Sequence, residues 1–244
     1  LRSGPGFFIR EQDTTETNRI GVLVFGSDQG MCGQLNDQVV SEALEQMERL
    51  GVDPEDLLFA AAGYRAAARL SAQGREVAAS FPMPGSADNI TDKVEDILFT
   101  IEEWLETRRI GTIYLFHARP SGGASYRPVS RRLLPVDRKW LQDLKKEPWP
   151  TRMLPLFTMD REALFSELIQ QYLFAALFRA FAESLASENA SRLASMQGAE
   201  RNIRERLAEL NNQYHQQRQM SITAELLDIV SGFEALESED SDAH

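Results

Sequence analysis

The chain is poor in cysteine, histidine and positive charge, and each scarcity excludes a class of function. Its 244 residues include one cysteine, Cys32, and three histidines, so we expect neither an internal disulfide nor a zinc site. Acidic residues outnumber basic ones by 37 to 26, giving a net charge of −11. Nucleic-acid binding needs clustered basic residues that contact phosphates, so we expect no nucleic-acid partner. The apolar run over 172–182 is far shorter than the roughly 20 residues of a membrane span, and we predict no transmembrane segment.

The C-terminal third lacks proline and nearly lacks glycine, the two residues that most disfavour helices. Between Asp160 and Leu236 there is no proline, and Gly198 is the one glycine before Gly232. A helix over this stretch would be about 110 Å long at 1.5 Å per residue. Its apolar positions are broad over 164–185 and then narrow to a stripe of steps of three and four, which is typical of a coiled coil. The predicted coiled-coil seam comprises Asn189, Leu193, Met196, Ile203, Leu207, Leu210 and Tyr214.

The residues before this helix alternate between strand and helix patterns. Buried strands are predicted over 20–25, 57–62, 76–81 and 112–117, with helices over 35–50, 64–73 and 86–109 between them. Residues 119–126 have the composition of a loop, and 127–136 form a last strand that could be an antiparallel edge. We therefore predict an α/β fold: a small, mostly parallel, Rossmann-like sheet domain followed by a very long C-terminal helix of coiled-coil type. The predicted boundaries are a connecting segment at 1–18, the α/β domain at 19–155, the helix at 156–236 and a disordered acidic tail at 237–244.

A glycine-rich turn, GSDQGMCG over 26–33, lies between the first strand and the first helix. Backbone N–H groups at such a position can bind a phosphate. The glycine spacing does not match a dinucleotide-binding motif and no lysine follows, so we interpret the turn as structural, with glycines at positive φ. Cys32 and His117 have no orienting third group that would indicate catalysis. We predict no catalytic residue, no cofactor site and no metal site.

The last part of the helix changes from polar to apolar. Residues 216–221 are rich in hydrogen-bonding groups, and after them an apolar face is formed by Ile222, Leu226, Ile229, Val230 and Phe233. An exposed apolar face this far along a helix indicates a protein partner.

At these residues the sequence resembles the gamma subunits of F-type ATP synthases. The family's C-terminal signature I-T-x-E-x-x-[DE]-x-x-x-G is matched by Ile222, Thr223, Glu225, Asp228 and Gly232. Residues 185–196, LASENASRLASM, are similar to the family's L-A-S-E-x-A-[AS]-R-M-x-A-M block. The turn matches the family's S-[ST]-D-[RK]-G-L-C-G-x-[LY]-N motif at Ser27, Asp28, Gly30, Cys32, Gly33 and Asn36. Departures at Gln29, Met31 and Phe233 indicate a divergent branch.

The resemblance implies a non-catalytic rotor subunit of the central stalk, which couples proton or sodium translocation through a membrane ring to ATP synthesis or hydrolysis on the alpha/beta hexamer. It implies that Arg218, Gln219, Thr223 and Glu225 contact the beta subunits, and that the α/β domain contacts the epsilon subunit and the ring of c subunits. The complex would place the chain on the cytoplasmic face of a bacterial inner membrane. Members of the family pair an N-terminal helix with the C-terminal one, and we expect that helix to be missing from a sequence that starts at Leu1. The alternative interpretation is a small-molecule or nucleotide-binding α/β domain that dimerises through its coiled-coil helix.

Overall fold

The computed structural model describes residues 19–137 and 156–241, with 142, 143, 146, 147, 151 and 153 between them, and side chains as far as Gly232. The predicted connecting segment over 1–18 lies outside the described residues. By compactness the chain divides into two units, Leu1–Ser195 and Met196–His244, and each is described by itself.

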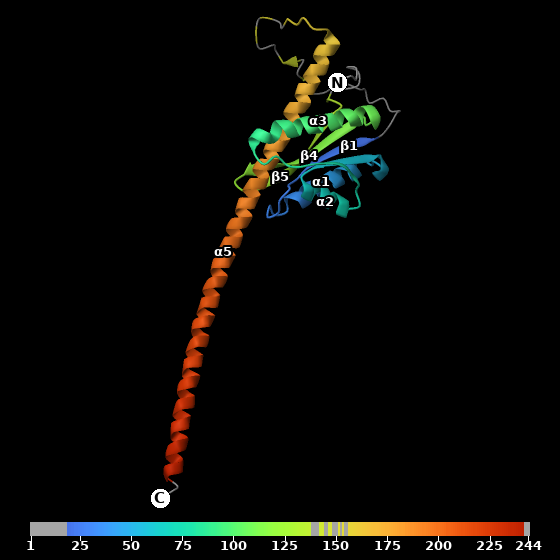
Figure 1. Cartoon of the computed structure of the whole chain (residues 1–244). Helices are drawn as coiled ribbons and strands as arrows, with labels where there is room; N and C mark the ends of the chain where they lie inside the picture. The colour runs from blue at the N-terminus through green and yellow to red at the C-terminus, as the bar shows by residue number, and fades with distance from the viewer. Residues whose placement is uncertain are drawn as a thin grey trace. The chain divides into compact units, whose positions relative to one another are not determined.

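The first unit is built on a five-stranded sheet with strand order β3-β2-β1-β4-β5 (Figure 1). Four strands are parallel and β5 is an antiparallel edge paired with β4, which confirms the predicted α/β fold and its mostly parallel sheet. The run IGVLVF lies in the central strand, where all six residues are buried, as a parallel strand covered on both faces requires. The strands are β1 (Ile20–Phe25), β2 (Leu57–Ala62), β3 (Val77–Phe81), β4 (Thr112–Gly122) and β5 (Ser125–Leu134).

Helices cover both faces of the sheet. Successive residues of β1 point to opposite faces: Val22 and Val24 pack in a cluster with residues of α1 (Leu35–Arg49) and α2 (Tyr64–Ala72). Leu23 and Phe25 pack in a second cluster with residues of α3 (Ile90–Thr107) and the first part of α5 (Arg161–Ser241). The two layers can be followed in Figure 1, where α1 and α2 lie on one side of the strands and α3 on the other.

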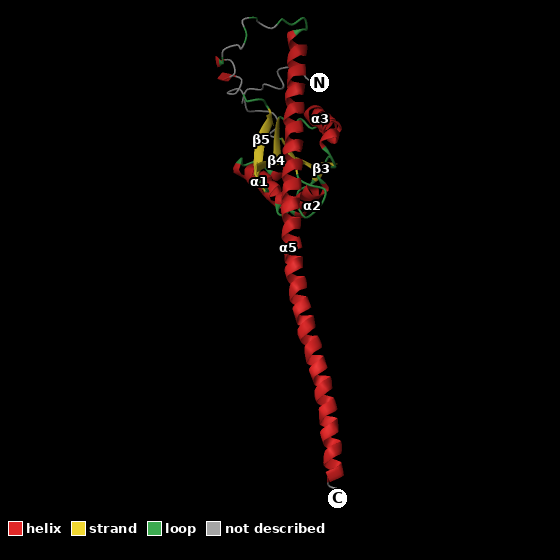
Figure 2. Ribbon diagram, turned by 90° about the vertical axis from the view of Figure 1, so that its left-hand side faces the viewer, coloured by secondary structure: helices red, strands yellow, loops and turns green. Residues whose placement is uncertain are grey.

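Helix α5 contributes residues 161–195 to the first unit, and Figure 2 shows this part of the helix running along the strands. Its apolar residues cover a broad face of the helix because they pack against the sheet. The Phe181 side chain is completely buried, with its ring 4.3 Å from that of Phe25 in β1. The other fully or nearly buried apolar residues of this part are Ile169, Leu173, Ala176, Leu177 and Ala180. In the second unit every residue from 201 to 232 is exposed. The narrow seam from Leu193 to Tyr214 is therefore solvent-facing in the chain on its own.

Two sequence-based predictions differ from the structure. Residues 119–126 are not a loop, because β4 reaches Gly122 and β5 begins at Ser125, and antiparallel pairing outweighs their Gly, Pro and Ser content. Gly122 and Gly123 take the positive φ values of 114° and 58° that a short hairpin turn needs. In addition, α5 extends to Ser241, so residues 237–241 are helical where we expected a disordered tail. Glutamate and alanine, frequent in this stretch, are good helix formers.

The contact between helix α5 and the glycine-rich turn

The glycine-rich turn after β1 is held by the side chain of Asn36, which lies in the first turn of α1. The Ser27 backbone N–H donates to Asn36 Oδ1 at 2.9 Å, and Asn36 Nδ2 donates to Ser27 Oγ at 2.8 Å. Cys32 Sγ lies 3.5 Å from Asn36 Nδ2 and 3.4 Å from Ser27 Oγ, and its side chain is buried. All three residues are buried, so each polar group needs a partner inside the protein. Cys32 serves here as a small packed residue.

Asp28 connects the same turn to two further segments. Its Oδ1 accepts the Tyr64 backbone N–H at 2.9 Å, at the start of α2, and its Oδ2 accepts the Met83 N–H at 2.8 Å, just after β3. A carboxylate near a helix N-terminus is favoured by the unpaired N–H groups and the helix dipole. Asp28 thus connects the turn to the start of α2 and to the segment that follows β3.

The predicted positive φ is confirmed for one glycine of the turn and wrong for the other two. Of Gly26, Gly30 and Gly33, Gly33 alone has positive φ, at 60°, and the non-glycine Met31 shares that conformation at 61°. Gly26 is needed for close approach, because a Cβ there would lie 2.4 Å from Asn36 Oδ1 and 2.6 Å from the Cβ of Ala66. The prediction of positive φ is therefore wrong for Gly26 and Gly30.

A polar stripe on α5, which we define as Glu183, Ser187, Ser191 and Arg192, contacts the turn and the middle of β4. Ser191 Oγ donates to the Cys32 carbonyl at 2.8 Å, and Arg192 Nε donates to the Gly30 carbonyl at 3.3 Å. Ser187 Oγ lies 3.2 Å from the carbonyl oxygen of Ala118 and 2.8 Å from that of Glu183. Residues four apart share one face of a helix, so the stripe runs along the side of α5 that meets the sheet.

Gly33, on the turn side of the contact, has no side chain and so leaves room for Ser191. A Cβ at Gly33 would lie 3.3 Å from Ser191 Oγ, closer than ordinary packing allows. The turn motif (27–36) and the 185–196 block, which the sequence presents as separate matches, are thus two halves of one contact. We did not predict it; the signal that could have indicated it is a set of serines four residues apart on a helix otherwise packed through apolar side chains.

His117, near the middle of β4, is paired with Glu183 of the stripe. His117 Nε2 lies 2.7 Å from Glu183 Oε2, and Glu183 Oε1 also receives Arg179 Nε at 2.8 Å and lies 3.4 Å from Arg119 Nε. Burial raises the pKa of Glu183, but the hydrogen bonds from Arg179 and His117 and the nearby positive charges outweigh it, so the net pKa is lowered. The lowered pKa favours the anionic form of Glu183, which accepts a hydrogen bond from His117 when the ring carries its proton on Nε2.

Burial lowers the pKa of His117 below its ordinary 6.5, although the Glu183 hydrogen bond and charge act to raise it. The unused Nδ1 atom is consistent with that direction: it is buried and has no hydrogen-bond partner among the described residues. A second proton on the ring would be placed on Nδ1, where nothing accepts it. His117 therefore supports the helix as a neutral hydrogen-bond donor.

Glu188 and Arg192 form a second, similarly buried pair beside the turn. Arg192 Nη2 lies 2.5 Å from Glu188 Oε1, and the Glu188 side chain is 6% exposed. Burial raises the pKa of Glu188 in spite of the Arg192 contact. Its second oxygen, Oε2, is buried without a partner in the described part of the chain. The pair orients the Arg192 guanidinium, whose Nε then reaches the Gly30 carbonyl.

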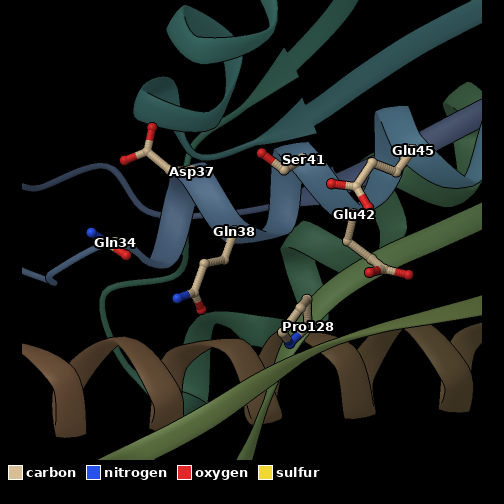
Figure 3. Close-up of a pocket in the computed structure, with 7 residues that line it drawn as sticks. All are labelled: Gln34, Asp37, Gln38, Ser41, Glu42, Glu45 and Pro128. Atoms are coloured by element: carbon tan, nitrogen blue, oxygen red, sulfur yellow. The ribbon is translucent and has the colours of Figure 1, made fainter.

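Two cavities near the turn differ in the charge of the residues that line them. A cavity of about 460 Å³ runs along α1 and beneath Pro128 of β5, and Figure 3 shows carboxylate and amide side chains around it. Its lining consists of Gln34, Asp37, Gln38, Ser41, Glu42, Glu45 and Pro128, none of which is basic. A second cavity of about 310 Å³ beside the turn contains Arg65 and Arg69, and Arg69 is ion-paired with Asp37 at 2.9 Å. Among the described residues, no group of three or more His, Cys, Asp and Glu residues could hold a metal ion.

The predicted contact residues of the second unit lie on the exposed part of α5. Arg218, Gln219, Thr223 and Glu225 are all exposed, and Thr223 Oγ1 bonds to the Gln219 carbonyl at 2.9 Å within the helix. Over the part of the chain that the structure describes, no helix has both the length and the apolar character of a membrane span.

These features define a class of protein in which an α/β domain is fixed by hydrogen bonds and apolar packing to the first part of a long helix, whose later residues as far as Gly232 are exposed. A family model described as ATP synthase matches residues 6–236. The chain is 27% identical over 226 residues to the ATP synthase gamma chain of Nitrosomonas eutropha, covering 92% of this chain and 76% of that one. It is 29% identical over 248 residues to the gamma chain of Nostoc sp., covering 91% and 76%.

Solved structures share the fold. A chain from the Euglena gracilis mitochondrial ATP synthase superposes with a TM-score of 0.66 at 18% identity, covering 91% of this chain and 74% of that one. A chain from the central stalk and c-ring structure of the Tetrahymena thermophila mitochondrial enzyme gives a TM-score of 0.56 at 19% identity, covering 78% and 80%. The chain belongs to the ATP synthase gamma chain family. It is a non-catalytic subunit, the rotor of the central stalk, as the sequence motifs predicted.

Proposed function

We propose that this chain carries rotation between a ring of c subunits in the membrane and a catalytic hexamer of alpha and beta subunits. The observation that carries the proposal is the contrast along α5. The helix packs against the sheet and is hydrogen-bonded to the sheet and the glycine-rich turn as far as Arg192, whereas its apolar residues after Met196 are exposed. A helix with exposed apolar residues needs a partner that covers them.

We propose that the beta subunits contact Arg218, Gln219, Thr223 and Glu225. All four side chains are exposed, and no described residue pairs with the Arg218 guanidinium, which leaves it able to bind an acidic or carbonyl-rich loop. Apolar residues on the same stretch, among them Ile222, Leu226 and Ile229, are 47–66% exposed and would be covered by the hexamer. The seam from Asn189 to Tyr214 would pair with a second helix of the rotor.

The mechanism that we propose is coupling by differential binding. An asymmetric helix that turns inside a ring of beta subunits presents different side chains to each of them in turn. Each subunit then favours the conformation that binds the presented face best, and its nucleotide affinity changes with that conformation. Such coupling requires no reacting group in the rotor, and the nucleotide sites would lie on alpha and beta.

The remaining partners and the location follow as proposals from the same function. The α/β domain, for which we propose the boundaries 19–155, would contact the epsilon subunit and the c ring at the membrane end of the stalk. The solved relative from Tetrahymena thermophila was determined as a central stalk with a c ring, which supports this placement. The gamma chain from Nitrosomonas eutropha is bacterial, which supports a position on the cytoplasmic face of a bacterial inner membrane.

Reconstitution with purified alpha and beta subunits tests the proposal. We expect this chain to co-elute with the hexamer, with a second rotor helix supplied if the seam requires it, and to give ATP hydrolysis. Arg218→Ala with Gln219→Ala should weaken association without unfolding the α/β domain. Arg201→Ala is the matched control, since it removes an exposed arginine from the same helix outside the proposed contact. Lack of association even with the added helix would overturn the proposal.

A further inference from the structure

The polar stripe of α5 makes hydrogen bonds that are not needed to bury the helix against the sheet. The apolar residues Leu173, Leu177 and Phe181 already bury one face of the helix against the sheet. Apolar burial is non-directional, so a helix held by it alone can turn or slide with little change in buried area. Hydrogen bonds depend steeply on distance and angle, and they resist such movement. The stripe therefore adds a constraint on the rotation of the helix about its own axis.

The acceptors of the stripe are themselves held in place. Ser191 donates to the carbonyl of Cys32, and Arg192 donates to the carbonyl of Gly30. These two carbonyls belong to the turn, which the side chains of Asn36 and Asp28 connect to α1, α2 and the end of β3. The stripe thus connects α5 to the frame of the domain through backbone groups, which cannot rotate away as a side-chain acceptor could. A continuous series of directional contacts runs from the helix through the turn to the sheet.

We propose that Ser191 and Arg192 are positioning residues that fix the angle of α5 relative to the α/β domain, and that torque passes between domain and helix through the glycine-rich turn. This inference rests on the proposed rotor function. A glycine-rich turn between a strand and a helix can bind a phosphate, but the inference gives this turn a mechanical role instead. Glu188 supports the role by orienting the Arg192 guanidinium.

The test measures torsional stiffness in the assembled complex. The hexamer is fixed to a surface and a probe is attached to the α/β domain through Glu45→Cys on α1, an exposed position. The one native cysteine, Cys32, is 2% exposed, so labelling at position 45 is selective. The angular variance of the probe is recorded while the hexamer is held in one nucleotide state. In the reconstituted membrane enzyme, ions pumped per ATP hydrolysed are measured in parallel.

We expect Ser191→Ala with Arg192→Ala to raise the angular variance about twofold, because both hydrogen bonds from the stripe to the turn are lost. Ser191→Thr retains a hydroxyl donor and should keep the wild-type variance. Arg204→Ala is the matched control: Arg204 also pairs with a glutamate four residues earlier, Glu200 at 2.6 Å, but the pair lies within the exposed part of the helix. It should leave the variance unchanged. The ratio of ions pumped to ATP hydrolysed should fall in the double variant alone.

The possible outcomes distinguish a failure of this inference from a failure of the proposed rotor function. Wild-type variance in the double variant, with the α/β domain folded by tryptophan fluorescence, would overturn the inference and assign torque transfer to apolar packing. If the double variant does not assemble, Ser191→Ala alone is measured in the same way, and wild-type variance there would have the same meaning. A wild-type chain that assembles but does not rotate would instead refute the proposed rotor function, and the inference with it.

Discussion

Replacing Asn36 with alanine tests whether the glycine-rich turn is a structural joint. The substitution removes the acceptor of the buried Ser27 N–H, which costs about 1–3 kcal/mol when a buried donor is left unsatisfied. It also removes the Asn36 Nδ2 bond to Ser27 Oγ, which contributes about 0.5–1.5 kcal/mol. The contact of Nδ2 with Cys32 Sγ is longer and weaker. We therefore expect the variant to lose about 2–4 kcal/mol of unfolding free energy.

Urea denaturation followed by tryptophan fluorescence measures this loss, because Trp104 is buried against the sheet in α3 and reports on the domain. With a slope of about 1–3 kcal/mol per molar urea, the midpoint should fall by roughly 1–2 M. Gln38→Ala is the matched control, since it removes an exposed amide from the same helix and should change stability by less than about 0.5 kcal/mol. A loss no larger than the control's would refute the reasoning, and recovery of stability on adding nucleotide would show that the turn binds a ligand.

Two further predictions concern the contact of α5 with the sheet. Phe181→Ala should destabilise the domain by about 3–5 kcal/mol, because it opens a cavity beside Phe25. Urea denaturation checks this, and a loss as small as that of Leu168→Ala, an exposed position on the same helix, would contradict it. His117→Asn should change the pH dependence of stability. Since the folded pKa of His117 lies below 6.5, the unfolded chain binds more protons in between, so wild-type unfolding free energy falls as the pH drops through 6.5. The variant should not lose unfolding free energy in this pH range. If the difference in unfolding free energy between wild type and variant is constant from about pH 7.5 to pH 5.5, His117 does not cause the pH dependence.

The sequence by itself determined the order and type of the elements. The buried strands at Ile20–Phe25 and Leu57–Ala62 have the bounds that their apolar runs predict, because a parallel strand covered on both faces must be apolar throughout. The long helix follows from the absence of proline, and the family follows from motifs that are local in sequence. Local propensity and periodicity carry this information before any tertiary contact forms.

Tertiary structure decided the edge of the sheet and the contact between the two motifs. Residues 119–126 have a loop composition, and only their pairing across β4 and β5 makes them a hairpin. Ser191 and Cys32 are 159 residues apart, and Ser187 and Ala118 are 69 apart. The four-residue spacing of the serines indicates a polar face on the helix, but it does not identify the acceptors, because any residue can supply a backbone carbonyl. The motifs were visible in the sequence, but their joint function required the fold that places one against the other.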